Sequence, residues 1–427
     1  MNFNSKLNII FSSFIFCWLL ACNTEVDDRH PEVKNSQVKI GILAPLTGPL
    51  AGFGQDFENT ARMAANEIDA LGGINGQSIG FIVRDSRLGR EDSEQAALQA
   101  TQELIESGVI GIIGPAGSGT TITIAPTAIA NGVPIISPSA TSPALTELDD
   151  SDLVWRTVAS DAFQGKFLAE QLILDQVNSI SVIYRGDAYG IGLKQSLIDS
   201  FTQQGGTVLA EVPYPANKEN NFDSQVSDLF ASGKPDAIVI ISFVTDGANI
   251  MVSLANSSQS PMPILYGVDG NKREELLENA PKSLLLGMKG SAPTAPATSP
   301  NYIAFAQNFE RYFNKPPPVF TESTYDAVYL LALSMAVAGE NSSAAIKNNL
   351  RSLSKADSIN PVVINVGSQG YKIALENLTQ DLDLEGAAGS INFDEFGDVT
   401  SGNYIAWEII EINGQLTFDT IREAAFP

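Results

Sequence analysis

Short apolar runs alternate with longer amphipathic stretches along the chain from Val38 onward. The run Val38 to Pro45 predicts a buried strand, and apolar residues then recur at helical spacing from Phe57 to Leu71, before the helix-ending pair Gly72-Gly73. Further strands are predicted at 78–84, 109–113 and 133–137, and further helices at 91–107 and 120–130. Strands that alternate with helices in this way predict a parallel sheet covered on both faces.

A second set of the same kind begins after Trp155-Arg156. Its predicted strands are 179–184, 208–212, 237–242, 263–266 and 284–288, and its predicted helices lie near 162–175, 190–204, 222–232, 246–257 and 272–279. A proline-rich break at 293–300 precedes helices near 301–314, 322–338 and 343–351. Two β-rich runs, 404–412 and 416–421, flank Asn413-Gly414, a pair typical of hairpin turns. The pattern predicts an α/β chain with two doubly wound lobes facing each other across a central cleft.

The first residues of the chain have the layout of an export signal. A polar start with Lys6 leads into the apolar segment Leu7 to Leu20, which is too short to span a bilayer comfortably. Ala21-Cys22 then resembles the bacterial lipobox, which predicts a signal peptide over 1–21 and a lipid-anchored Cys22. An ordinary signal peptide with an incidental cysteine is the alternative. The polar stretch 22–37 predicts a tether to a body facing the periplasm or the exterior.

Composition narrows the function classes. A chain of 427 residues exceeds the size at which single cores stop growing, so two lobes are expected. Its two cysteines are Cys17 and Cys22, and loss of the signal segment would leave no disulfide. The net charge of −24 is spread along the chain and disfavours nucleic acid or an anionic membrane surface as partner. The single histidine, His30, lies in the tether, so the folded body lacks the commonest general base and metal ligand.

The glycine-rich segment Gly114 to Thr121 resembles a phosphate-binding loop at first sight. That loop needs a lysine where Thr120 stands, and without the cation the phosphates lack their main counter-charge, which argues against an ATP site. Exposed N–H groups between a strand and a helix could instead hold a carboxylate, and a plain tight turn is the alternative. Three hydroxyls and two prolines after the next predicted strand, in Pro138 to Pro143, form a rigid polar corner or simply a turn.

Several segments in order resemble the type I periplasmic binding proteins of the leucine/isoleucine/valine-binding kind. They are Ile40 to Pro49, Gly72 to Gly76, Gly114 to Thr121, Pro138 to Pro143, Asp187 to Gly190, Thr324 to Ala327 and Ile391 to Asp394. The resemblance covers nearly all of residues 38–421. It implies three chain crossings, near 156–160, 288–292 and 398–402. Lobe 1 would then comprise 38–157 and 291–399, and lobe 2 would comprise 158–290 and 400–427.

The resemblance also implies site residues. Ser118, Ser139, Ala140 and Thr141 match positions that hold the α-carboxylate and amino group of the ligand. Tyr189 matches an aromatic residue that closes over the ligand, with ordinary packing as the alternative. Asp269, in Gly267 to Gly270, matches an acid that pairs with the ammonium, although Asp-Gly is equally a turn dipeptide. Phe53 and Phe243 match apolar wall positions or belong to the core.

The chain departs from the family pattern in two respects, and the second concerns the ligand. Founding members of the family carry a disulfide in the first lobe, which this chain cannot form after cleavage. The stretch 352–386 is also longer and more polar than expected, a feature of family branches whose ligands vary.

The sequence therefore predicts an extracytoplasmic lipoprotein that captures a small polar metabolite, above all an amino acid, with no cofactor or metal. The family resemblance implies delivery of this ligand to an ABC permease. A sensory or cell-envelope regulatory lipoprotein on the same fold is the main alternative. An amidase acting through Ser118 or Thr141 is disfavoured because no histidine is available and no Ser-x-x-Lys begins at Ser118 or Ser139.

Overall fold

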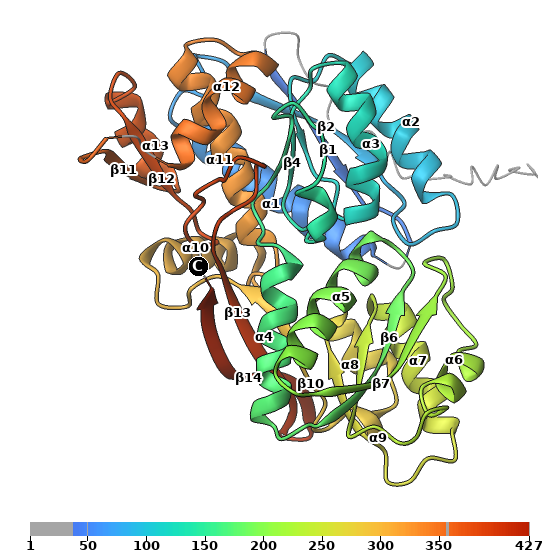
Figure 1. Cartoon of the computed structure of the whole chain (residues 1–427). Helices are drawn as coiled ribbons and strands as arrows, with labels where there is room; N and C mark the ends of the chain where they lie inside the picture. Colours follow the sequence, from blue (N-terminus) through green and yellow to red (C-terminus); the bar gives the residue numbers. More distant parts are fainter. Residues whose placement is uncertain (1–36, 49, 356–357, 427) are drawn as a thin grey trace, which may run out of the picture. The chain divides into compact units, whose positions relative to one another are not determined.

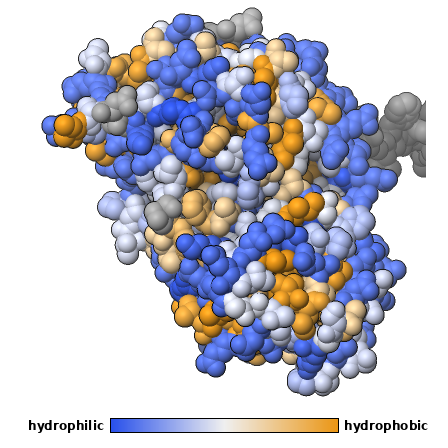
Figure 2. Space-filling view, in the orientation of Figure 1, coloured by the Kyte–Doolittle hydropathy of each residue, from blue (hydrophilic) through white to orange (hydrophobic). Residues whose placement is uncertain are grey.

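The computed structural model describes residues 37–48, 50–355 and 358–426, which belong to one compact unit (Figure 1). The predicted signal peptide, Cys22, His30 and all but the last residue of the predicted tether lie outside the described residues. Among the described helices, none is both long enough and apolar enough to cross a membrane. The face shown in Figure 2 is mostly hydrophilic, with apolar residues in small groups.

The strands in the first part of the chain form a five-stranded sheet. Its strands run parallel in the order β2-β1-β3-β4-β5, as expected for strands joined by helices. The strands are β1 Val38–Ala44, β2 Ile79–Asp85, β3 Ile112–Ile113, β4 Ile135–Ser137 and β5 Val154–Arg156. The connecting helices are α1 Ala51–Asp69, α2 Ser93–Glu106, α3 Ser118–Ala130 and the short 3₁₀ turn η1 Pro143–Leu145.

The strands in the middle of the chain and the C-terminal hairpin form a seven-stranded sheet. The order is β14-β13-β10-β9-β8-β6-β7, parallel except at β13 and β14. The strands are β6 Ser179–Arg185, β7 Thr207–Tyr214, β8 Ala237–Ile241, β9 Ile264–Gly267, β10 Lys289–Thr294, β13 Gly402–Ile412 and β14 Gln415–Phe426. The helices are α4 Asp161–Leu174, α5 Ala188–Gln203, α6 Asp223–Asp228, α7 Val244–Asn256, η2 Asp269–Asn271, α8 Glu274–Asn279 and α9 Lys282–Leu285.

The chain returns to the first sheet after β10. Helices α10 Pro300–Phe313, α11 Thr321–Ala338 and α12 Ser343–Ser354 follow, and α11 packs on α1, β3 and β4 (Figure 1). Buried residues of β1, α1 and α11 share one core cluster. β10 pairs within the seven-stranded sheet as far as Thr294, beyond the predicted lobe boundary at 291, and the lobe assignment stays a prediction.

The polar stretch 352–386 contains elements that the sequence pattern does not reveal. β11 Val362–Asn365 and β12 Leu382–Glu385 form a two-stranded parallel sheet with α13 Ser368–Glu376 between them. Ile364 and Leu384 are buried, whereas Val363 is 49% exposed. A single apolar face on such short strands is too weak a signal to identify them.

The predicted strand at 284–288 is wrong. Residues Lys282–Leu285 form α9, Gly287 has a φ of +80°, and the strand is β10, Lys289–Thr294. In the apolar run Leu285 is buried at the end of α9 whereas Leu286 is 59% exposed, and Trp407 lies against β10 at Gly290. A Cβ atom at Gly290 would lie 2.2 Å from Cζ2 of Trp407.

The predicted hairpin is confirmed. β13 and β14 pair antiparallel, and Ile412 lies opposite Gln415. Asn413 and Gly414 both have positive φ values, +54° and +82°, as a two-residue type I′ turn requires.

Candidate functional site

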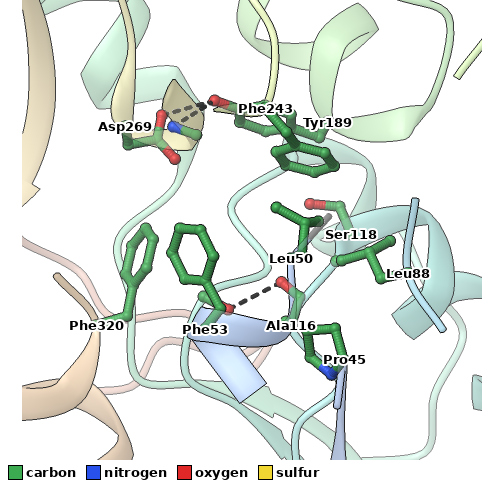
Figure 3. Close-up of a pocket in the computed structure, with 13 residues that line it drawn as sticks. Pro45, Leu50, Phe53, Leu88, Ala116, Ser118, Tyr189, Phe243, Asp269 and Phe320 are labelled. Carbon is green, nitrogen blue, oxygen red and sulfur yellow. Dashed lines mark hydrogen bonds between the residues drawn. The ribbon is translucent and has the colours of Figure 1, made fainter. Parts of the chain in front are cut away.

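A pocket with about 410 Å³ of open space lies where residues around the two sheets meet (Figure 3). Its lining comes from the ends of strands and the first turns of helices. The lining residues are Pro45, Leu50, Phe53, Leu88, Ala116, Gly117, Ser118, Ser139, Tyr189, Phe243, Asp269, Gly270 and Phe320. Six of the eight predicted ligand-binding residues are among them, and Ala140 and Thr141 are not.

One wall of the pocket is aromatic and comes from α5 and from the residue before α7, beside the seven-stranded sheet. The rings of Tyr189 and Phe243 stack with centroids 5.6 Å apart and planes 3° apart. The guanidinium of Arg185 lies 4.0 Å from the centroid of Phe243 and is itself paired with Asp187 and Asp246. Asp187 caps α5 by accepting a hydrogen bond from the Gly190 N–H, which places Tyr189 in the first turn.

The facing wall comes from α1 and from the start of α11. The ring centroids of Phe53 and Phe320 are 6.3 Å apart, and Figure 3 shows both rings across the pocket from Tyr189 and Asp269. The Arg273 guanidinium carbon lies 4.2 Å from the centroid of Phe53. Each aromatic wall is therefore backed by a guanidinium, and the space between the walls suits an apolar group.

Asp269 is both a turn residue and a pocket residue. It lies in η2, directly after β9, and its side chain is buried. Oδ1 accepts hydrogen bonds from the Tyr189 hydroxyl and from Nε2 of Gln164, both at 2.8 Å. Burial raises the pKa of the Asp269 carboxyl, whereas the bonds from Tyr189 and Gln164 favour its ionised form.

A second acid, Asp161, lies buried near Asp269. Its side chain is fully buried, and neither carboxylate oxygen has a hydrogen bond of good geometry within 37–48, 50–355 and 358–426. Burial, followed by the negative charge of Asp269, raises the pKa of the Asp161 carboxyl well above its usual range. Oε1 of Gln164 is likewise buried and unpaired within the described chain, whereas the Thr141 hydroxyl interacts with Asp161 and opposes the rise of its pKa.

The buried guanidinium of Arg156 opposes the rise of the Asp161 pKa but is itself paired with another acid. Arg156 forms two hydrogen bonds with Asp398, of 2.6 and 2.5 Å, and its Nη1 donates to the Ser142 carbonyl at 2.9 Å. Neither Asp161 nor Asp269 forms an ion pair within the described residues. When Asp161 and Asp269 are ionised, no ion pair offsets their negative charge on this side of the pocket.

Hydroxyls and backbone N–H groups occupy the other polar side of the pocket. Ser118 begins α3, and its Oγ accepts a hydrogen bond from the Ser142 N–H at 3.1 Å, which leaves its own proton free to be donated. The first N–H groups of α3 have no partner within the helix, so an anion can bind there. Ser139 instead donates its proton to the Ala116 carbonyl at 2.9 Å.

The two predicted residues outside the pocket are buried behind it. The Ala140 N–H donates to Oγ of Ser137, and the Thr141 carbonyl accepts from the Asp161 N–H. Neither lines the open space, so a direct role for them stays a prediction. No group of three or more His, Cys, Asp or Glu side chains in the described part of the chain is placed to hold a metal ion.

Comparison with known proteins gives consistent matches over most of the chain. Residues 37–369 match the family model described as periplasmic binding protein. A substrate-binding protein of a chemotactic signal transduction system, BasB of Halobacterium salinarum, is 26% identical over 366 residues, covering 83% of each chain.

Solved structures share the fold at lower identity. The leucine-binding protein LivK of Thermotoga maritima is 23% identical with a TM-score of 0.74, covering 90% of this chain and 98% of that one. A solute-binding protein of an ABC transporter from R. palustris, solved with 4-hydroxybenzoate, is 17% identical with a TM-score of 0.73, covering 91% and 97%.

Proposed function

Because the chain belongs to the periplasmic binding protein family, we propose that it captures an amino acid with an apolar side chain between its two sheets. The protein would deliver this ligand to an ABC-type importer. The predicted residues Ser118, Tyr189, Asp269, Phe53 and Phe243 would contact it.

The observation that carries this proposal is the acidic side of the pocket. Asp269 lines the space, Asp161 is buried close by, and neither forms an ion pair within the described residues. A ligand ammonium group would supply the missing positive charge and three N–H donors. Charge-assisted hydrogen bonds of this kind contribute roughly 1.5–3 kcal/mol each.

The remaining surfaces suit the other two parts of an amino acid. Ser118 and the first turn of α3 offer donors to a carboxylate. Phe53, Phe320 and Leu50 offer apolar contact to a side chain.

The names of the two structural relatives point to one ligand that has an ammonium group and one that lacks it. One is named as a leucine-binding protein, and the other was solved with 4-hydroxybenzoate, an acid without an amino group. An anion lacking the ammonium would meet Asp269 with no compensating charge. The acidic side of the pocket therefore favours the amino acid.

A thermal-shift panel on the chain from Val33 onward tests the ligand class. We expect L-leucine and L-phenylalanine to raise the melting temperature, because a ligand at a hundred times its Kd stabilises the native state by about 2.7 kcal/mol. The matched compounds without an amino group, 4-methylpentanoate and 3-phenylpropanoate, should give no shift at the same concentration. A shift with 4-hydroxybenzoate and none with either amino acid would refute the proposal.

The chemotactic relative supports a second candidate function, that of a sensor on the same fold. A sensor would bind the same class of ligand and contact a signalling protein instead of a permease. Uptake of labelled L-leucine in cells lacking the gene separates the two candidates. Reduced uptake supports transport, whereas normal uptake with an altered chemotactic or regulatory response supports the sensor.

We also propose that Cys22 carries a lipid anchor, on the strength of the Leu19-Leu20-Ala21-Cys22 sequence. Cys22→Ser should move the protein from the membrane fraction to the soluble fraction, and intact-mass analysis should find a diacylglycerol group on the wild type only. Continued membrane association of Cys22→Ser, with no lipid on the wild-type cysteine, would contradict the anchor.

A further inference from the structure

Arg273 links the two sides of the pocket. It directly precedes α8, just beyond the η2 turn that carries Asp269, so it belongs to the part of the chain around the seven-stranded sheet. Its side chain is only 12% exposed. Nε pairs with Glu275 on its own side at 3.2 Å, whereas Nη2 reaches α1, which packs on the five-stranded sheet.

The partners of Arg273 on α1 lie three residues apart, on the same face of the helix. Nη2 is 3.2 Å from Oδ2 of Asp56, a side chain that is 5% exposed. The guanidinium carbon is 4.2 Å from the ring centroid of Phe53. One planar cation therefore makes an ion pair and a ring contact at the same time, a geometry that lysine cannot reproduce.

The contact between Arg273 and Phe53 bears on ligand binding because Phe53 lines the pocket. The same ring lines the pocket and packs against Phe320 and Phe57. A guanidinium against this ring fixes a surface that a ligand side chain would touch. The position of Arg273 therefore affects the pocket wall through its contact with Phe53, although Arg273 itself does not line the pocket.

We propose that Arg273 is a positioning residue that stabilises the closed arrangement of the two sheets through Asp56 and sets the Phe53 wall in that arrangement. The inference rests on the proposed function only in that a ligand enters this pocket. Separating the sheets would return Asp56 and Arg273 to water. The closed arrangement therefore contains one buried ion pair and one cation–ring contact that an open one would lack.

Lys315 provides a matched control. Its Nζ lies 2.7 Å from Oδ1 of Asp56, but it follows α10, which packs on α1, so this pair forms on one side of the pocket only. Lys315→Ala removes a positive charge next to Asp56 and leaves the Arg273 contact in place. Its effect on closure should be small.

Distance measurements between two labels test the proposal without a ligand. The chain from Val33 has no cysteine, so labels can be attached to Gln102→Cys on α2 and Gln195→Cys on α5, both exposed. We expect the ligand-free parent to show a short-distance component. Asp56→Asn and Arg273→Lys should reduce this component severalfold, and Lys315→Ala should retain it. Equal distance distributions in all four proteins, or an equal loss in Lys315→Ala, would overturn the proposal.

Dissociation of L-leucine gives a second readout. Asp56→Asn and Arg273→Lys should release L-leucine about tenfold faster with little change in association rate, because the closed complex is the state that loses its contacts. If the parent does not bind L-leucine while the label distances still respond to Asp56→Asn, the proposed ligand class fails and the role of Arg273 stands.

Discussion

Replacing Asp269 with alanine is expected to weaken the binding of L-leucine several hundredfold. The ligand ammonium would remain buried without its partner, and breaking a buried pair costs on the order of 3–5 kcal/mol. Alanine would also leave the Tyr189 hydroxyl and Nε2 of Gln164 without their acceptor, Oδ1 of Asp269. Isothermal titration calorimetry of the wild type and the variant measures the change directly.

The Asp269→Asn variant distinguishes the role of the Asp269 charge in ligand binding from the structural role of this residue in the turn. Asparagine keeps an oxygen acceptor and is well accepted in turns, so the variant should unfold near the wild-type temperature. Its affinity for L-leucine should nevertheless fall almost as far as that of Asp269→Ala. A loss below about fivefold, or roughly 1 kcal/mol, in both variants would leave Asp269 with a turn role alone.

Glu322 is expected to make the native state less stable as the pH rises towards neutrality. Burial raises the pKa of its carboxyl to about 7 from an ordinary 4.5, although backbone N–H groups and Thr321 oppose the shift. Between these pH values the native state holds a proton that the unfolded chain has lost. The free energy of unfolding therefore falls by about 1.4 kcal/mol per pH unit, or about 3 kcal/mol in all.

Glu322→Gln mimics the protonated acid and should lack this dependence. Denaturant unfolding at pH 5 and pH 8 should show similar stability of variant and wild type at pH 5, and a variant more stable by about 2–3 kcal/mol at pH 8. Glu340→Gln, an exposed position just beyond the same helix, is the control and should follow the wild type at both pH values. A constant difference between Glu322→Gln and wild type at the two pH values would contradict the assignment.

Much of the fold can be predicted because its core strands are apolar runs bounded by turn residues. β8, Ala237–Ile241, is buried at every position, and such a run has few alternatives. β10 could not be found in this way, because Trp407 leaves room only for small residues at Gly290. The short strands β11 and β12 could not be predicted for a different reason, because each buries only one face.

The pocket could be predicted where motif and turn chemistry coincide. Asp187 caps the helix that presents Tyr189, and Asp269 follows a buried strand, so both positions carry a local signal. Phe320 carries no such signal, because it lines the pocket from a left-handed backbone conformation with a φ of +71°. Asp161 and Arg273 depend on contacts between segments more than a hundred residues apart, which periodicity does not show.

The order of strands in the seven-stranded sheet bears on how copies of the protein behave when they are concentrated. Its two outer strands, β7 and β14, present unpaired backbone groups that could add a strand from a neighbour. β7 carries Glu211 and Pro213, and proline offers no N–H to a new partner. β14 exposes Asp419 and Glu423 along its length. We therefore expect growth of the sheet from one copy to the next to be opposed at both edges.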